Sequence, residues 1–520
     1  MAQLIVYLVI LLALFLCYLL LHRYRRNRNT VVSEWPVVGM LPMLLNNVTS
    51  IHDGGSYLLK KLGGTYEFKG PWLANMNFIA TSDPLNVQHV LAKNFVNYPK
   101  GLEFKEIFEP FGDGIFNSDS DVWKNHRKMF HQLLIGHSKF MVFMAKTLQQ
   151  KVVNCLIPFL NHFSDAGFEV DLQEVFQRLT FDSTCSMILG FDPKSLSIEL
   201  PEVAAEKAFD IIEEAVLRRH VLPQSLWKLQ KWLQIGEEKK LAKAWKVFDE
   251  FLYQCISSKR RELRQSCKNQ KEKDANFDVL TAYLEEEEKQ GQAKDDNQFG
   301  YSDIFLRDIS FNFMFAGRDS VSAGITWFFY VIARYPHVEA KILEEMKENF
   351  PQKELNDHEN NGLFNIEVLS KLVYFHAAIC ETFRLFPPIP FNHKVAAKDD
   401  VLPSGHFVKR NTRILILFYA MGRMKKIWGE DSFEFKPERW ISKEGGLVNV
   451  PSHKFIAFNT GPRSCLGKDM AFIQMKIIAA ALLWNFRFRL VDQRPAYPDA
   501  SIVLKIKNGL KVRVSKRLVH

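Results

Sequence analysis

Cysteine is sparse in this sequence, and its seven cysteines include no Cys-x-x-Cys pair. An odd number of scattered cysteines argues against a disulfide framework and against a zinc site, and it favours a reducing compartment. The sequence also has no basic array with interleaved aromatic residues, so its net charge of +10 does not by itself indicate a nucleic-acid partner. We find no internal repeat. The cysteines stand at positions 17, 155, 185, 255, 267, 380 and 465.

Charge is absent from the beginning of the chain. Residues 4–21 contain no charged side chain, and residues 22–28 are strongly basic. As a helix the apolar run would span about 27 Å, close to the thickness of the hydrocarbon layer of a bilayer. Basic residues that follow such a run hold the rest of the chain in the cytosol, whereas a cleavable signal peptide has the reverse order. We therefore predict a retained membrane anchor at residues 1–28, with a cleaved presequence as the alternative.

The remaining chain is predicted to contain a linker and one large domain. Pro36 and Pro42 suggest a stiff linker over residues 29–48, because proline prevents a helix from continuing. The length of 520 residues alone suggests two or more domains, but one large cofactor can organise a single helix-rich core. Hydrophobic residues make up 47% of the chain, enough for a substantial core. We assign residues 49–520 to one domain.

The hydrophobic pattern predicts a mainly α fold with small β-sheets. Apolar residues recur at spacings of three and four over residues 171–189 and 241–263, which indicates helices. Strand-like pieces are few, at residues 66–68, 78–81, 408 and 413–417. Residues 265–276 and 285–298 are predicted to be exposed connections. The acidic run at residues 285–288 is interpreted as a solvated helix end, because no histidine brackets it as a metal site would need.

One cysteine lies in a motif whose parts have a common chemistry. Cys465 stands between Gly461 and Gly467, two residues after Arg463 and seven after Phe458. A thiolate can donate strongly to a haem iron and favour O–O cleavage, and nearby backbone N–H groups set its electron density. The glycines would let the backbone approach a flat macrocycle. Arg463 suits a haem propionate, and Phe458 can keep water from the sulfur.

These positions resemble the cytochrome P450 signature Phe-x-x-Gly-x-Arg-x-Cys-x-Gly, and every fixed position is matched. Taken alone, Cys465 can also be read as one more buried, inert thiol. The resemblance implies a helical haem domain with small β-sheets and an N-terminal transmembrane helix. It further implies haem b as the cofactor, with its iron ligated axially by Cys465.

A second informative region is the apolar stretch at residues 307–334, which is predicted to be one helix. It contains Ala316, Gly317, Asp319 and Ser320. Two small residues together can open a groove for a ligand, and an acid and a hydroxyl beyond it can relay protons; an ordinary kink in a buried helix is the alternative. The stretch resembles the oxygen-binding segment of the distal helix in cytochromes P450. Serine replaces the usual threonine, so the stiffening methyl group is lost.

Two further pairs complete the set by resemblance. Glu381 and Arg384 share a helix face, and they match the family's Glu-x-x-Arg helix, with Arg439 as the partner from its Pro-Glu-Arg segment. The resemblance implies a buried charge network that locks the cysteine loop, with backbone acceptors for the extra positive charge. Trp123 and Arg127 match the family pattern that places both on haem propionates. By themselves, these two pairs are typical of surface ion pairing and of plain packing.

Exposed lysines near the same motifs suggest a redox partner. We hypothesise that Lys124, Lys128 and Lys468 form a basic face that docks an acidic flavoprotein reductase, which would pass on electrons from NADPH. The alternative is that each is simply a solvated lysine.

The closer resemblance is to plant microsomal cytochromes P450 of the fatty-acid and alkane hydroxylase clan, near the midchain alkane hydroxylases. It implies a single-pass protein of the endoplasmic reticulum membrane whose catalytic domain faces the cytosol. The linker departs from the more proline-rich hinge common in such enzymes. The resemblance is carried by residues 69–73, 97–101, 386–394 and 401–406.

The implied reaction is hydroxylation of an apolar long-chain substrate with O₂ and reductase-delivered electrons. Midchain hydroxylation of alkanes is the leading prediction, and Phe116, Phe313 and Ile389 are candidates for the substrate pocket because they lie near the motifs. A fatty-acid hydroxylase and a phenol-coupling oxidase remain alternatives within the family. A membrane haem-binding protein without turnover is the alternative from another class.

Overall fold

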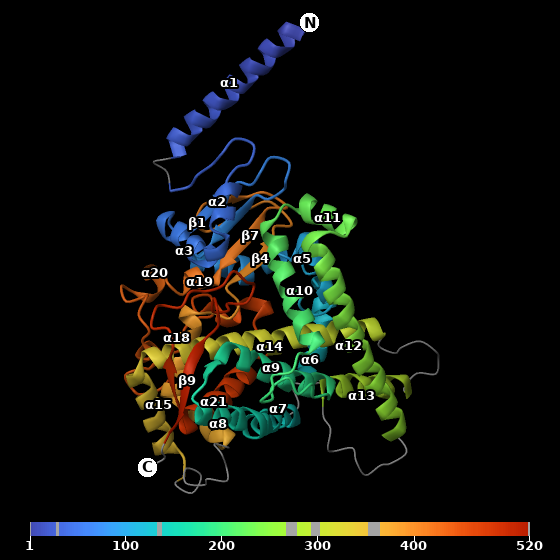
Figure 1. The fold of residues 1–520 in the computed structure, drawn as a ribbon, viewed down its shortest axis with the longest axis vertical. Helices are drawn as coiled ribbons and strands as arrows, with labels where there is room; N and C mark the ends of the chain where they lie inside the picture. Colours follow the sequence, from blue (N-terminus) through green and yellow to red (C-terminus); the bar gives the residue numbers. More distant parts are fainter. Residues whose placement is uncertain are drawn as a thin grey trace.

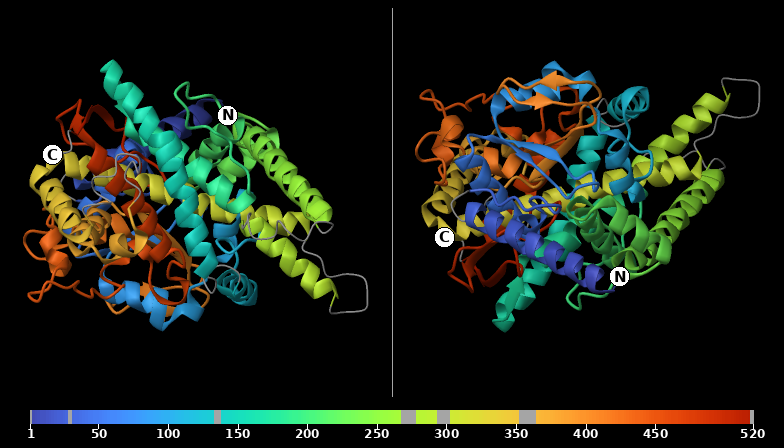
Figure 2. Two further views of the ribbon diagram at one scale, coloured as in Figure 1. Left: turned by 90° about the horizontal axis from the view of Figure 1, so that it is seen from below. Right: turned by 90° about the horizontal axis from the view of Figure 1, so that it is seen from above.

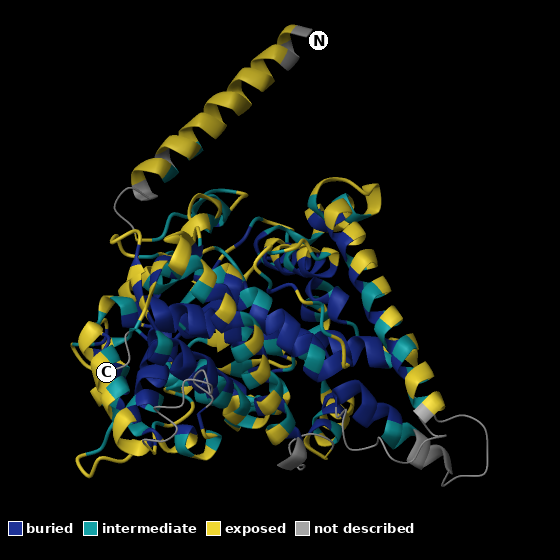
Figure 3. Cartoon of the chain, turned by 60° about the horizontal axis from the view of Figure 1, so that its bottom comes forward, coloured by how far each residue is buried: buried dark blue, intermediate teal, exposed yellow. Residues whose placement is uncertain are grey.

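A helix of 32 residues, α14 (Asp303–Arg334), crosses the middle of the molecule, and most of its side chains are buried (Figures 1 and 3). It begins before the predicted residue 307, at the N-cap Ser302, whose hydroxyl accepts a hydrogen bond from the Phe305 N–H. It ends before Pro336, which cannot continue the same hydrogen-bond ladder. The predicted long apolar helix is confirmed.

The computed structural model describes residues 2–27, 31–132, 138–266, 278–292, 302–351 and 364–517. The α-helices are α1 (Ala2–Asn27), α2 (Leu41–Asn46), α3 (Ile51–Lys61), α4 (Pro84–Gln88), α5 (Gly101–Ile107), α6 (Ser120–Phe130), α7 (Ser138–Lys151), α8 (Ile157–Ala166), α9 (Leu172–Leu189), α10 (Ala204–Val221), α11 (Gln224–Leu233), α12 (Gly236–Ser266), α13 (Val279–Gln292), α14, α15 (Pro336–Asn349), α17 (Ile366–Lys371), α18 (Val373–Leu385), α19 (Phe418–Met421), α20 (Lys425–Trp428) and α21 (Lys468–Asn485).

The strands form three small sheets. One sheet has four strands in the order β1-β2-β7-β4, with β2 and β7 parallel and the other pairs antiparallel. A second sheet has the order β3-β9-β8, and β5 pairs with β6. The strands are β1 (Thr65–Phe68), β2 (Phe78–Thr81), β3 (Glu169–Asp171), β4 (Phe391–Val395), β5 (Asp400–Val401), β6 (Phe407–Val408), β7 (Arg413–Leu417), β8 (Phe486–Leu490) and β9 (Lys511–Lys516).

The core divides into two large clusters that meet at α14. Helices α10, α12 and α13 lie toward one end of α14, and the C-terminal segments that include α18 and α21 lie toward the other (Figures 1 and 2). Phe311 and Phe315 of α14 belong to the first cluster, and Trp327 belongs to the second. The middle of α14 therefore lies where the two halves of the domain join.

The N-terminal helix α1 stands apart from this body and is exposed along its length (Figures 1 and 3). Its segment Val6–Arg25 has a mean hydropathy of 2.2 with no part buried. An exposed apolar helix of this length is consistent with a membrane anchor.

Two predicted connections differ from the structure. Part of the predicted linker is helix α2, because Pro42 stands in the first helical turn, where its missing N–H costs nothing. The predicted connection over residues 285–298 is wrong at its beginning, since α13 continues to Gln292 and Glu287 pairs with Arg260 at 3.2 Å. Residues 267–276 and 293–298 lie outside the described residues.

The predicted strands at residues 66–68, 78–81, 408 and 413–417 are confirmed as parts of β1, β2, β6 and β7. Strand β8 was missed, although its residues alternate between buried and exposed along the sequence Phe-Arg-Phe-Arg-Leu.

Candidate active site

The loop that carries Cys465 is built from two 3₁₀ turns, Ile456–Phe458 and Gly461–Arg463. Gly461 adopts a φ of 70°, and a Cβ there would lie 2.1 Å from the carbonyl oxygen of Leu91. Only glycine fits both conditions. Packing against Leu91 therefore explains why position 461 is glycine. The approach of Gly461 to a macrocycle stays a prediction. At Gly467 an added Cβ would meet only the Cys465 sulfur at 4.0 Å, so the space there does not demand glycine.

The Cys465 side chain is accessible to solvent, although protein atoms surround its thiol on most sides. Its backbone N–H donates to the Phe458 carbonyl at 2.8 Å, which closes the loop. Burial raises the pKa of the Cys465 thiol, while the Gly467 N–H and the Arg127 guanidinium oppose that rise. A metal cation at the sulfur would favour the thiolate. The accessible thiol with an N–H donor beside it therefore suits a metal ligand.

Beside the loop, Phe458 packs in an aromatic group with ring-centre distances of 5.4 Å to Phe383 and 5.2 Å to Phe472. This contact anchors the Phe458 ring on the core between α18 and α21. Its predicted role in covering the sulfur stays a prediction.

One stripe of α14 is accessible although the helix is otherwise buried. Ala316 is exposed, and Phe313 and Ser320 are half-buried. These residues are three or four positions apart, so they share one helix face. Phe313 packs against the same core cluster as Leu466, the residue after Cys465. The accessible face of α14 and the cysteine loop therefore border the same apolar cluster.

Gly317 does not belong to that accessible face. A Cβ on Gly317 would lie 3.1 Å from Oγ1 of Thr184 on α9, so the small residue permits close packing of the two helices. The predicted two-residue groove is therefore narrower than expected, with Ala316 alone exposed. Ser320 donates to the Ala316 carbonyl at 2.6 Å, within the helix.

Asp319 lies in a buried charge cluster that sequence reasoning missed. Its carboxylate is 3.1 Å from Arg318, which also contacts Asp210 of α10 at 2.7 Å. The carboxylates of Asp210, Glu213 and Asp319 lie within 4.8 Å of one another. Lys505 binds Glu213 at 2.7 Å, so the cations already fill the space that a metal would need. Burial raises the pKa of Asp319 to about 7, with a further rise from Glu213.

The charge network around Glu381 has the predicted members and more. Arg384 donates to both oxygens of the Glu381 carboxylate at 2.7 Å, and Arg439 lies 3.4 Å from it. The indole of Trp440 also donates to Glu381, at 2.9 Å. The excess positive charge meets backbone acceptors as predicted: Arg384 donates to the carbonyls of Ser432 and Glu434, and Arg439 donates to that of Trp428. The network joins α18 to the segment before the cysteine loop, and Arg439 is fully engaged there.

Trp123 and Arg127 of α6 lie against the cysteine loop. Arg127 donates to the Ser464 carbonyl at 2.9 Å. The Arg463 guanidinium stacks 4.6 Å from the Trp123 ring centre and pairs with Asp119 at 2.7 Å. The structure therefore brings together Trp123, Arg127 and Arg463, the three residues predicted to lie at the haem propionates.

Two buried lysines beside them were missed. Burial lowers the pKa of Lys394 to about 7, with a further lowering from Arg463, and the pKa of Lys100 falls well below its usual value for the same main reason. Lys394 Nζ has no hydrogen-bond partner among the described residues, and Lys100 Nζ donates to the Phe116 carbonyl. Such a surplus of buried positive charge calls for anionic ligands. A haem, with two propionates, fits this group and the accessible thiol.

A local signal for these lysines existed in the sequence. Both stand in passages that carry the resemblance, at residues 97–101 and 386–394, but neither passage by itself indicates a role. The surplus of positive charge becomes visible only in the folded protein, where Lys100 and Lys394 both lie near Arg463.

The three residues predicted for a substrate pocket are half-buried and pack against one core cluster. Phe116 lies within an aromatic group, 5.1 Å from Phe108 and 5.7 Å from Phe315 between ring centres. Phe313 lies 4.8 Å from Phe130. Ile389 precedes strand β4. The three residues therefore border one apolar cluster, and Phe313 itself stands on the accessible face of α14.

Lys124, Lys128 and Lys468 are exposed. Lys124 pairs with Asp121 at 2.9 Å. Among the described residues, Lys128 and Lys468 have no ion pair, so two of the three keep a free charge at the surface that flanks the cysteine loop.

Comparison with known proteins agrees with these observations. The family model described as cytochrome P450 matches residues 31–513. The chain is 42% identical to alkane hydroxylase MAH1 of Arabidopsis thaliana, with 94% of each chain covered. It is 40% identical to noroxomaritidine synthase of Narcissus aff. pseudonarcissus, covering 98% of this chain and 96% of that protein. It is 36% identical to cytochrome P450 86B1 of Arabidopsis thaliana, covering 98% and 90%.

A match over nearly the whole length, on a mainly helical domain with small β-sheets, shows the family. The chain belongs to the cytochrome P450 family, the haem–thiolate monooxygenases that use electrons derived from NADPH through a reductase.

Proposed function

We propose that this protein hydroxylates long-chain alkanes at a midchain position, with Cys465 as the axial ligand of haem b. The observation that carries the proposal is the composition of the accessible face of α14. Besides the Ser320 hydroxyl it presents Ala316 and Phe313, and the neighbouring core cluster is aromatic or aliphatic. An unactivated alkyl chain needs such an apolar surface. The name of the Arabidopsis relative, an alkane hydroxylase, supports the same substrate class.

The haem, when bound, supplies oxygen activation and C–H oxidation, and the protein supplies the surroundings. The Gly467 N–H stabilises negative charge on the Cys465 sulfur. Lys100, Lys394 and Arg463 offer cations for the propionates, and Trp123 packs under Arg463. Arg127 holds the loop through the Ser464 carbonyl. The network of Glu381, Arg384 and Arg439 fixes the segment that precedes the loop.

Proton delivery is assigned to Asp319 and Ser320. Asp319 is buried with a pKa raised to about 7, so it can hold or release a proton near neutral pH. Ser320 is half-buried on the accessible stripe, and its hydroxyl lies 2.6 Å from the Ala316 carbonyl. In this proposal Asp319 draws protons from the charge cluster on α10, and Ser320 presents them at the accessible face.

The setting of the enzyme follows from its termini and surface. Helix α1 serves as a single-pass anchor in the endoplasmic reticulum membrane, and the basic residues after it keep the domain in the cytosol. The NADPH–cytochrome P450 reductase docks on the face that carries Lys128 and Lys468. The domain boundaries follow: an anchor over residues 1–28, a connecting segment over residues 29–48, and the haem domain over residues 49–520.

The alternatives differ in the substrate. A fatty-acid hydroxylase would need a cation positioned for a carboxylate, and Arg413 near the surface pocket already pairs with Glu103 at 2.5 Å. A phenol-coupling oxidase would oxidise its substrate without adding oxygen. Membership in a monooxygenase family disfavours a haem-binding protein without turnover.

The deciding experiment is turnover of the purified enzyme, reconstituted with reductase and NADPH, on alkanes and fatty acids of matched length under ¹⁸O₂. We expect labelled secondary alcohols from alkanes and slower turnover of the acids. Faster turnover of the acids, or products without label, would reject the alkane assignment.

A further inference from the structure

Two histidines meet in the apolar region between α10 and the sheet. His220 stands near the end of α10, and His393 lies on β4, with ring centres 5.8 Å apart and ring planes at 70°. Phenylalanine rings surround both: Phe108 and Phe391 lie 5.4 and 5.5 Å from His220, and Phe104 lies 5.6 Å from His393. Polar rings in such surroundings need hydrogen-bond partners.

Three of their four ring nitrogens have no such partner among the described residues. They are Nε2 of His220 and both nitrogens of His393, which is 1% exposed. Only Nδ1 of His220 is engaged, 2.8 Å from the Val216 carbonyl. Leaving a buried polar atom without a hydrogen bond destabilises a protein, so a set of three such atoms in one place points to a ligand.

The chemistry of the two rings can be worked out from these contacts. Burial lowers the pKa of His220 to about 4 and that of His393 far below its usual value; Arg413 lowers both further, and Lys100 and Lys394 add to the effect on His393. Both rings are therefore neutral. A carbonyl only accepts, so Nδ1 of His220 carries the hydrogen and Nε2 is an acceptor. Neutral His393 offers one donor and one acceptor. Together the rings offer an acceptor on His220 and a donor and an acceptor on His393, none of which has a partner among the described residues.

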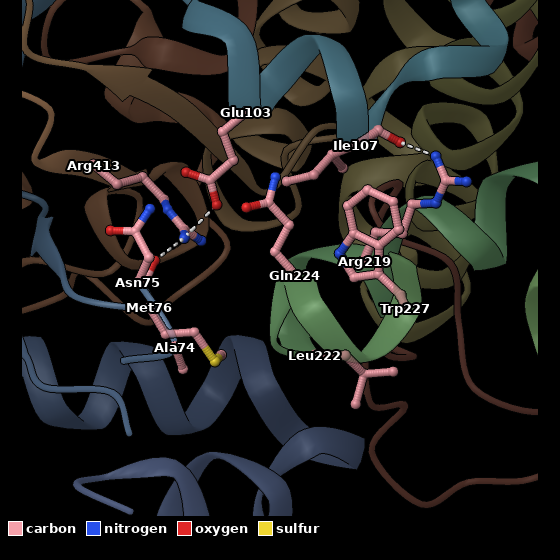
Figure 4. Close-up of a pocket in the computed structure, with 10 residues that line it drawn as sticks. All are labelled: Ala74, Asn75, Met76, Glu103, Ile107, Arg219, Leu222, Gln224, Trp227 and Arg413. Atoms are coloured by element: carbon pink, nitrogen blue, oxygen red, sulfur yellow. Dashed lines mark hydrogen bonds and ion pairs between the residues drawn. The ribbon is translucent and has the colours of Figure 1, made fainter. Parts of the chain in front are cut away.

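The pair also lies between the surface and the central helix. Arg219 and Leu222, which flank His220, line a surface pocket with Ile107 and Arg413 (Figure 4). On the other side, the rings of Phe108, Phe116 and Phe315 follow one another toward α14, with centres 5.1 and 5.7 Å apart. A chain bound along these rings would have one end at the histidines.

We propose that His220 and His393 bind the hydroxyl group of a long-chain aliphatic alcohol. The hydroxyl hydrogen is donated to Nε2 of His220, and the oxygen accepts the ring N–H of His393. Ring centres 5.8 Å apart are compatible with one oxygen that makes a hydrogen bond of about 2.8 Å to each ring. This inference rests on the proposed function, because it takes the apolar region as the substrate site. It adds alcohols to alkanes as ligands and places their hydroxyl away from the cysteine loop.

The proposal makes a distinction that an apolar cavity alone would not make. An alcohol satisfies both histidines, its methyl ether can only accept, and a carboxylate cannot donate to Nε2 of His220. A site built for a hydroxyl rejects analogues that leave its polar groups unpaired. We expect the alcohol to bind at least about fivefold more tightly than its methyl ether and than the acid of equal length.

The test is equilibrium binding to the full-length holoenzyme without NADPH, followed by the change in haem absorbance. Ligands are the n-alkane, the primary alcohol, its methyl ether and the fatty acid of one chain length. His220→Phe and His393→Phe should each lose the preference for alcohol over ether while they keep alkane binding. His220→Gln, which retains an acceptor, should restore part of the preference. His52→Phe is the matched control, because this buried ring already has a partner in the Ser501 carbonyl.

The outcomes separate the two proposals. If the wild-type protein binds the alkane but binds alcohol and ether equally well, the proposed function stands and this inference is overturned. The two rings would then bind only water. Tighter binding of the acid, or an unchanged preference in both phenylalanine variants, also overturns it. Binding of the alcohol without the alkane supports the histidine site and rejects the alkane assignment. If the phenylalanine variants lose their haem spectrum, the glutamine variant and the wild-type ligand series still decide.

Discussion

The guanidinium of Arg384 donates a hydrogen bond of 2.7 Å to each oxygen of the Glu381 carboxylate, three positions earlier on α18. Neither side chain is exposed to solvent. The same carboxylate accepts the Trp440 indole N–H, and the arginine also donates to backbone carbonyls of the following segment. A pair that is usually a minor surface contact is here the connection between the helical core and the cysteine loop.

Arg384→Lys should therefore destabilise the protein strongly. An ammonium group cannot make the forked contact with Glu381, and it leaves the Ser432 and Glu434 carbonyls without their Arg384 donors. We expect a loss of about 3 kcal/mol or more in the free energy of unfolding, with loss of bound haem. Chemical denaturation and haem content measure both effects. Lys124→Ala breaks the exposed pair with Asp121 and should change neither. A stable, haem-replete lysine variant would contradict the assigned role.

Cys465→Ala should abolish activity and the absorbance band that marks thiolate-ligated haem after reduction under CO. The physical reason is that alanine has no electron pair to donate to iron. Cys155→Ala, at a half-buried cysteine remote from the loop, should leave that spectrum intact. A surviving thiolate spectrum in Cys465→Ala would mean that another residue is the ligand.

Ser320→Thr should tighten the coupling between NADPH consumption and product formation. The Ser320 hydroxyl already bonds the Ala316 carbonyl, and a threonine methyl would restrict its rotation about χ1. The expected result is less hydrogen peroxide per NADPH oxidised, measured in the reconstituted system. Ser302→Thr, at the N-cap of the same helix, is the control and should leave peroxide release unchanged. Equal peroxide release in both variants would show that the missing methyl is irrelevant.

Lys394→Met should have opposite effects on the haem-free and haem-bound protein. The folded-state pKa of Lys394 is about 7, below the usual 10.5, so between these values the unfolded chain binds more protons. Stability of the haem-free protein therefore rises with pH across this range, and the penalty of the buried charge is complete below pH 7. Methionine removes that penalty, so it should stabilise the haem-free protein most at low pH. If Lys394 binds a propionate, the same change should speed haem loss.

A second buried lysine provides the control for this prediction. Lys476 Nζ donates to the carbonyls of Leu369 and Leu372 at 2.7 and 3.0 Å, so Lys476→Met leaves acceptors unpaired and should destabilise the haem-free protein. Thermal unfolding at pH 6 and pH 9, with haem transfer to an acceptor protein, measures both variants. Slower haem loss from Lys394→Met would contradict the assignment of Lys394 as a ligand of a haem propionate.

The features that the sequence alone could establish are those whose chemistry is local. The exposed apolar helix at the N-terminus follows from one uncharged run, and the cysteine loop from five positions within ten residues. The Glu381–Arg384 pair follows from a spacing of three on a helix. Helices α9, α12 and α14 follow from the recurrence of apolar residues, and the structure only adjusts their ends.

Tertiary structure alone decided which faces meet. The sequence places Gly317 in a predicted ligand groove, but the residue packs on Thr184 of another helix. Lys100 and Lys394 are nearly 300 positions apart, and their surplus charge exists only because the fold buries both beside Arg463. His220 and His393 likewise meet only across α10 and β4. Helical periodicity tells which residues share a face, but the partner of that face is set by packing across the whole chain, which no local pattern contains.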